Sequence, residues 1–123
     1  MSVFDNIALP LLFSKKPATP EKVTRLAEMV GLEHRLNHVP SQLSGGEMQR
    51  TAIARGLIND PEILLADEPT GNLDSENSDK IFGILRSLRS NGLTIIMITH
   101  NPDLAARANR TVHIKDGLVH TES

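Results

Sequence analysis

Apolar and polar residues in the second half of the chain follow the pattern of a strand, a helix and a second strand. Residues 62–70, "EILLADEPT", contain a four-residue apolar run that ends at Asp67 and Glu68. A short apolar run of this kind predicts a strand buried on both faces. Residues 74–92 repeat apolar side chains at helical spacing, and residues 93–100, "LTIIMITH", contain a second apolar run. Two buried strands joined by a one-sided helix predict a right-handed crossover between parallel strands.

The other predicted elements are helices in the first half and a hairpin at the end. One-sided helices are predicted over residues 20–30 and 46–58. Residues 3–13 contain a proline and predict a helical turn or an irregular segment instead of a strand. A short helix is expected near residues 102–108, and residues 111–120 carry an Asp-Gly pair between alternating positions, which signals a two-residue hairpin turn. The predicted fold class is α/β, with a parallel sheet, flanking helices and a C-terminal β-hairpin.

Composition narrows the class of protein. With 123 residues, 39% hydrophobic residues and a formal net charge of -2, the chain suits one domain and lacks the basic surface of a nucleic-acid-coating protein. Aromatic residues make up only 2%, which argues against a stacking surface for single-stranded nucleic acid. No apolar run approaches the ~20 residues of a membrane-spanning helix, and the start lacks a signal-peptide pattern. We therefore expect a soluble protein, and the absence of cysteine fits a reducing compartment.

Polar side chains follow both predicted strands at the point where each strand ends. Asp67 and Glu68 come after the first, and Thr99 and His100 after the second. Ligands of open α/β sheets bind outside the carboxyl ends of the strands, so these side chains are expected to share one edge. Two carboxylates and an imidazole could hold a metal, orient a water and contact a phosphate. Taken singly, Asp67 and Glu68 could equally be a polar strand end, and His100 is more often structural than catalytic.

The segment "LSGGE" has a structural and a functional interpretation. Ser44 and Glu47 are spaced as a capping box, which would open a helix without any further role. Gly45 and Gly46, however, are each unfavourable by ~1 kcal/mol in a first turn. Glycine allows close approach of the backbone, and free N–H groups with a serine hydroxyl at a positive helix end suit a phosphate. The functional interpretation is therefore an anion site at this turn.

Together these motifs resemble the ATP-binding subunit of ABC transporters. "LSGGEMQR" is similar to the signature motif of that family, "ILLADE" to its Walker B strand with the adjacent glutamate, "GNLD" to its D-loop and "ITH" to its switch histidine. The resemblance extends over about residues 3–121 and is greatest to the lipoprotein-release and macrolide-export branch. It implies a partial P-loop NTPase fold in which residues 1–123 form one incomplete ATP-binding domain. Residues 1–60 would form a helical part with the signature, and residues 61–123 the remaining motifs.

The resemblance also implies ATP and Mg²⁺ as cofactors and a role for each motif residue at the strand ends. Asp67 would hold Mg²⁺ through water, Glu68 would polarise the attacking water, and His100 would contact the γ-phosphate. These roles suit phosphoryl transfer, which depends mostly on positioning and charge stabilisation.

A second set of residues is implied to serve a nucleotide held by a partner subunit. Ser44, Gly45 and Gly46 would bind the γ-phosphate of that nucleotide, and Asp74 would connect the two sites across a dimer. The implied partners are therefore a second ATP-binding subunit and integral membrane subunits of the transporter. The implied location is cytoplasmic, peripheral on the inner face of the plasma membrane, and no nucleic acid is expected as a partner.

The phosphate loop of this family is absent from the 123 residues. It requires G-x-x-x-x-G-K-[ST], and the sequence contains no Gly-Lys pair. We therefore expect the chain neither to bind ATP tightly nor to hydrolyse it alone, and to be marginally stable or to aggregate in isolation because strand edges and apolar faces are uncovered.

Three functions remain open from the sequence. The first is an ATP-binding subunit of an ABC transporter, represented by its C-terminal portion. The second is a non-catalytic piece that docks on a complete ATPase subunit and modulates it, which the missing Gly-Lys pair favours. The third is a related chromosome-maintenance ATPase, against which stand the absence of long heptad arms and of a basic stripe.

Overall fold

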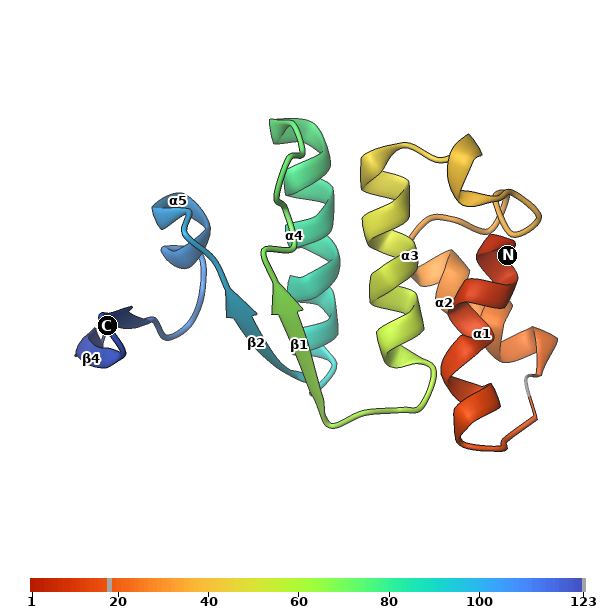
Figure 1. The fold of residues 1–123 in the computed structure, drawn as a ribbon, viewed down its shortest axis with the longest axis horizontal. Helices are drawn as coiled ribbons and strands as arrows, with labels where there is room; N and C mark the ends of the chain where they lie inside the picture. Colours follow the sequence, from red (N-terminus) through yellow and green to blue (C-terminus); the bar gives the residue numbers. More distant parts are fainter. Residues whose placement is uncertain (18, 123) are drawn as a thin grey trace.

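The computed structural model describes residues 1–17 and 19–122 of the chain, excluding the side chains of residues 121 and 122. Helices dominate the first half, and two small sheets occupy the second half (Figure 1). The elements are, in chain order, α1 (Val3–Phe13), α2 (Pro20–Met29), the 3-10 turn η1 (Pro40–Gln42), α3 (Gly45–Leu57), β1 (Ile63–Asp67), α4 (Ser75–Ser90), β2 (Thr94–Ile98), α5 (Pro102–Ala105), β3 (Val112–Lys115) and β4 (Leu118–Glu122).

The predicted crossover is confirmed. Strands β1 and β2 pair in parallel, in a register that sets Ile63 opposite Thr94 and Asp67 opposite Ile98. Helix α4 connects them and runs beside the sheet in the opposite direction (Figure 1). The carboxyl ends of both strands therefore lie at one edge, and residues 68–74 lead from the end of β1 to the N-terminus of α4.

The prediction that both strands are buried on both faces is wrong. Leu64 is 7% exposed and belongs to the hydrophobic core, whereas its neighbour Leu65, which points to the other face of the pleat, is 71% exposed. Ile96 and Ile98 on β2 are likewise 48% and 57% exposed. The physical reason is that the described residues form a two-stranded parallel sheet and supply packing helices to only one of its faces.

Residues 3–13 form a regular helix, α1, where the sequence predicted a helical turn or an irregular segment. Ser2 caps the helix by accepting the N–H of Asp5 at 3.1 Å. Its first N–H groups, from Val3 and Phe4, donate to loop carbonyls at 2.8 and 3.0 Å. Burial of one face of α1 in the core outweighs the missing N–H of Pro10, which lies inside the helix.

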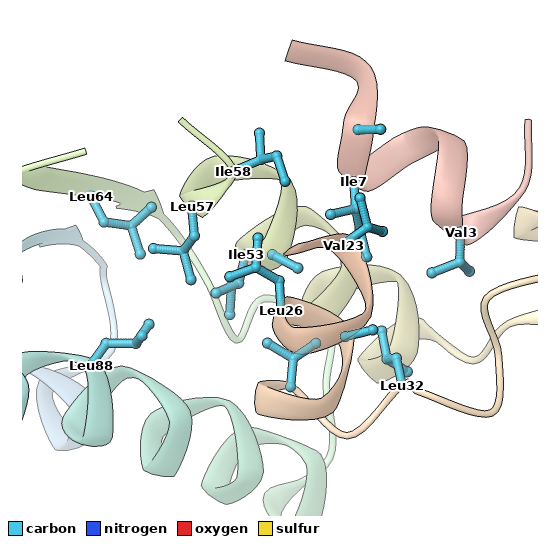
Figure 2. Packing of buried hydrophobic residues seen from close by; sticks show 14 of the residues in the cluster. Val3, Ile7, Val23, Leu26, Leu32, Ile53, Leu57, Ile58, Leu64 and Leu88 are labelled. Atoms are coloured by element: carbon cyan, nitrogen blue, oxygen red, sulfur yellow. The ribbon is translucent and has the colours of Figure 1, made fainter. Parts of the chain in front are cut away.

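The core lies between α1, α2, α3 and the covered face of the sheet. Leu57, Leu64 and Leu88, from α3, β1 and α4, point toward one another, while α1 and α2 pack on the other side of α3 (Figure 2). The largest side chains with almost no exposure are Ile7, Leu32, Ile58, Ile81, Val3, Val23, Val30 and Pro69. Helix α3 is thus the central element against which the helical half and the sheet both pack.

The C-terminal hairpin is confirmed, and it lies far from α1 (Figure 1). Strands β3 and β4 are antiparallel and are joined at Asp116 and Gly117, whose φ angles of 54° and 77° are those of a two-residue turn with both residues left-handed. The preceding helix α5 is shorter than predicted and ends at Ala105. Arg107, which follows it, pairs with Asp79 of α4 at 3.0 Å and stacks on Phe82.

None of the helices in the described part of the chain is both long and apolar enough to cross a membrane.

The exposed sheet face generates a prediction about self-association. Substituting Leu65 by Lys should reduce light scattering by the purified 123-residue chain, because it places a charge in the middle of the uncovered apolar face. Met29→Lys is the matched control, since Met29 is also exposed, at 47%, but lies on α2. Equal scattering by the two variants, or a single steep and reversible unfolding transition of the unsubstituted chain, would contradict the expected aggregation.

Candidate functional site

The strand ends bring Asp67, Glu68 and His100 to one edge of the sheet. Asp67 closes β1 opposite Ile98, and the next residue, Glu68, donates its N–H to the carbonyl oxygen of Ile98 at 2.7 Å. Glu68 adopts a left-handed backbone conformation, with φ of 46°, which is uncommon for a residue other than glycine and is frequent at functional sites. The sequence prediction that these side chains share an edge is supported by this geometry.

The carboxylate of Glu68 ties the ends of the two strands together. Its Oε1 accepts the backbone N–H of His100 at 2.8 Å, and its Oε2 accepts the hydroxyl of Thr99 at 3.3 Å. The Nε2 atom of His100 lies 3.7 Å from Oε1, and the histidine side chain is 98% exposed. Glu68 is therefore oriented by protein donors, while the imidazole is free to meet a ligand.

Asp67 is the candidate metal ligand at this edge, and its side chain is exposed. Within residues 1–17 and 19–122, no cluster of three or more His, Cys, Asp or Glu side chains could hold a metal ion. A single carboxylate still fits Mg²⁺, which proteins commonly bind through one or two carboxylates together with waters and substrate phosphates.

The capping box at the start of α3 is confirmed. Ser44 Oγ accepts the N–H of Glu47 at 3.1 Å, and Glu47 Oε1 accepts the N–H of Ser44 at 3.0 Å. Ser44 and Gly45 are exposed. Because the first N–H groups of a helix have no intrahelical acceptor, those of Gly45 and Gly46 point out of the helix end.

The two glycines are not equivalent, and the structure gives Gly46 a packing role that the sequence did not reveal. A Cβ atom on Gly46 would lie 2.5 Å from Oδ1 and 2.9 Å from Cγ of Asn77, in the first turn of α4. A Cβ atom on Gly45 would meet only Leu73 Cδ2, at 3.4 Å. Gly46 is therefore required for close approach of α4, and only Gly45 is fully open to a ligand.

Asp74 caps α4 beside this contact. Its Oδ1 accepts both the backbone N–H of Asn77, at 2.8 Å, and the side-chain amide of the same residue, at 3.0 Å. Helices α3 and α4 run side by side in the same direction, so their N-termini lie together (Figure 1). The structure thus brings Asp74 next to the Ser44–Gly46 turn.

Arg35 is a residue near this turn that the sequence analysis missed. Its Nε donates to Glu47 Oε2 at 3.0 Å. The backbone N–H of Ser44 and then this guanidinium hold the pKa of Glu47 below the ordinary value of 4.5. No sequence signal could have identified Arg35, because it lies in a loop 12 residues before its partner and belongs to no motif.

Comparison with known proteins places the chain among relatives of one kind. The family model described as ABC transporter matches residues 1–71. The chain is 53% identical over 121 residues to the macrolide export ATP-binding/permease protein MacB of Chlorobium phaeobacteroides, covering 97% of the chain and 18% of that protein. It is 48% identical over 121 residues to the lipoprotein-releasing system ATP-binding protein LolD of Shewanella denitrificans, covering 96% of the chain and 52% of LolD.

Solved structures agree with this result. The dimeric post-hydrolysis structure of the ATP-binding cassette MJ0796, bound to ADP and Pi, superimposes with a TM-score of 0.84 and 38% identity, over 100% of the chain and 56% of the cassette. The predicted ABC ATPase fold is confirmed by this likeness. The chain spans about half the length of LolD and of the cassette, and less than a fifth of MacB.

Because Gly45 and Gly46 have different surroundings, substitution by alanine should affect stability differently at the two positions. Gly46→Ala should destabilise the chain by about 1–3 kcal/mol, because its Cβ displaces the Asn77 side chain from Asp74. Gly45→Ala should be neutral or stabilising, since Ala is favoured over Gly in a helix by roughly 0.5–1 kcal/mol. Urea unfolding measures both, and Asn77→Ala should recover part of the Gly46→Ala loss. Equal losses in the two glycine variants would contradict the packing role.

The lowered pKa of Glu47 predicts a loss of stability in acid. A carboxyl group whose pKa is lower in the folded than in the unfolded chain contributes stability above its unfolded pKa, and this contribution is lost as the pH falls through the folded pKa. Urea midpoints of the chain should therefore fall more steeply between pH 6 and strongly acidic pH than those of Glu47→Gln. Parallel profiles for the two proteins would contradict the assignment.

Proposed function

The chain belongs to the ABC transporter family of ATP-binding domains, and we propose that it contributes one half of a nucleotide site shared with a second subunit. The observation that carries this proposal is the exposed, Ser44-capped N-terminus of α3, which lies beside the capped N-terminus of α4. The transporter would belong to the branch of MacB and LolD, the relatives that the chain resembles.

At the strand edge, the chain would act on the nucleotide through three side chains. Asp67 would hold Mg²⁺ either directly or through water. When bound, Mg²⁺ would neutralise charge on the phosphates. Glu68 would polarise the attacking water, and its bonds to Thr99 and to the backbone of His100 fix the direction of the carboxylate. The exposed imidazole of His100 would contact the γ-phosphate. These side chains would act mainly through their positions and less through their basicity.

The Ser44–Gly46 turn would face a nucleotide held by the partner subunit. The Ser44 hydroxyl accepts the N–H of Glu47, and its own proton remains available to a phosphate oxygen. The N–H groups at the open helix end supply further donors and the positive end of the helix dipole. Asp74, which caps the adjacent helix, would connect this turn to the strand edge across the dimer.

The 123 residues contain no Gly-Lys pair, so this polypeptide alone would lack the phosphate cradle. We therefore propose that it neither binds ATP tightly nor hydrolyses it without a partner. Residues 1–60 would carry the signature and residues 61–123 the metal, water and histidine functions. Integral membrane subunits would be the other partners, which implies a peripheral position on the inner face of the plasma membrane.

A second candidate function follows from the same missing pair. By docking on a complete ATPase subunit, the chain would form a dimer with at most one functional site and would lower the ATPase rate of that subunit. A mixture of the two proteins with an unchanged ATPase rate would count against this modulating role.

The proposed half-site predicts nucleotide binding only with a partner. The purified chain should show no saturable binding of a fluorescent, non-hydrolysable ATP analogue, whereas its addition to a complete homologous subunit should tighten binding by that subunit. Ser44→Asp should abolish the tightening, because aspartate caps the helix as well as serine does but repels a phosphate.

Ser2→Asp is the matched control for this variant. It introduces the same charge at another serine-capped helix N-terminus, that of α1, and should leave the tightening unchanged. Saturable binding by the chain alone, or persistent tightening by Ser44→Asp, would overturn the proposal.

A further inference from the structure

We propose that Arg35 is a positioning residue for the Ser44–Gly46 turn, and that it keeps this helix end receptive to phosphate by neutralising Glu47. The inference rests on the proposed function, because it concerns the same turn. It adds a residue outside every motif, contributed by the loop between α2 and η1.

A continuous set of hydrogen bonds joins Arg35 to the serine. Arg35 Nε donates to Glu47 Oε2 at 3.0 Å, Glu47 Oε1 accepts the N–H of Ser44 at 3.0 Å, and Ser44 Oγ accepts the N–H of Glu47 at 3.1 Å. The Glu47 side chain is 18% exposed and that of Arg35 is 42% exposed. Both oxygens of the Glu47 carboxylate are therefore engaged, one by Arg35 and one by Ser44, which fixes its rotamer.

Glu47 presents an electrostatic conflict that Arg35 resolves. A carboxylate in the first turn stabilises a helix by occupying the positive end of its dipole. A phosphate arriving at the same end would be repelled by that carboxylate, since unit charges separated by several ångströms interact appreciably near a protein surface. Pairing with Arg35 preserves the cap and cancels the negative charge, so the turn can accept a second anion.

A second arginine at this helix end, Arg50, is engaged by other acceptors. Arg50 donates from Nε to the carbonyl oxygen of Gly46 at 3.4 Å and from Nη1 to that of Val30 at 3.1 Å. The second of these bonds reaches the C-terminal cap of α2. Arg50 would therefore not replace Arg35 as the partner of that carboxylate.

The loop that carries Arg35 is itself held in place. The backbone N–H of Arg35 donates to the Leu32 carbonyl at 2.9 Å, and its carbonyl accepts the N–H of His38 at 2.9 Å. The carbonyls of Leu36 and His38 accept the first N–H groups of α1. Arg35 thus extends from a backbone turn that is fixed to α1 at one side and reaches α3 at the other.

A double-mutant cycle on Arg35 and Glu47 tests the inference in the complex of the chain with a complete homologous subunit. Arg35→Gln should weaken the tightening of ATP-analogue binding by about two- to fivefold at low salt, the range expected for one charge at a helix end. The effect should shrink as salt is added, because salt screens charge interactions at the exposed helix end. Glu47→Gln removes the charge but retains an oxygen acceptor for Ser44, and should bind at least as tightly as the unsubstituted chain.

The double variant Arg35→Gln/Glu47→Gln distinguishes charge compensation from a structural role. Charge compensation requires the double variant to recover most of the affinity lost in Arg35→Gln, and Arg35→Lys to retain most of it. A structural role predicts that the double variant is as weak as Arg35→Gln or weaker, which would overturn the inference. Lys22→Gln, which breaks a 2.6 Å ion pair with Asp60 away from the turn, is the matched control and should bind normally.

Binding measurements with the unsubstituted chain distinguish failure of the proposed function from failure of the inference about Arg35. If it does not tighten nucleotide binding by the complete subunit, the proposed function fails, and the inference fails with it. If it does so but Arg35→Gln binds equally well at low salt, only the role of Arg35 is overturned. Circular dichroism of each variant checks that the helices are retained.

Discussion

The parallel pairing of β1 with β2 is the constraint from which the geometry of the candidate site follows. Parallel strands need a crossover, and α4 provides it, so both strands end at the same edge of the sheet. Gly46 then lets α3 approach α4 closely, which sets the N-termini of the two helices side by side. A shift in the pairing of β1 with β2 would separate Glu68 from Thr99 and His100.

Several hydrogen bonds of the candidate site serve two purposes. Glu68 accepts donors from the end of β2, which stabilises the strand pair and also aims the carboxylate. Ser44 and Asp74 cap helices and are at the same time the residues that the family resemblance assigns to a nucleotide. Capping alone would explain both residues in the isolated chain, so the functional assignment depends on the family and on the exposure of the turn.

The sequence was sufficient for features that depend on local pattern. The crossover, the hairpin turn at Asp116 and Gly117, and the Ser44 capping box are all set by residues close together in the chain, and the structure has each of them. Contacts between distant segments were beyond such patterns. The packing of Gly46 on Asn77, the pairing of Arg35 with Glu47 and the docking of α1 on two loop carbonyls depend on tertiary arrangement. Burial of β1 and β2 was overestimated because an apolar run does not reveal which face its neighbours cover.

Fully buried side chains are distributed unevenly along the chain, so some segments of the backbone should open to solvent more readily than others. All of the largest fully buried side chains except Ile81 and Pro69 lie before residue 60, around α3, whereas β3 is exposed along its whole length. Amide hydrogens in α3 should consequently be among the slowest to exchange with solvent, and those of the hairpin among the fastest. The Ser44 turn thus belongs to the rigid part of the molecule and His100 to the part that opens more easily, so a nucleotide bound at the strand edge would order the second half, whereas a partner's nucleotide at the turn would meet a surface that is already ordered.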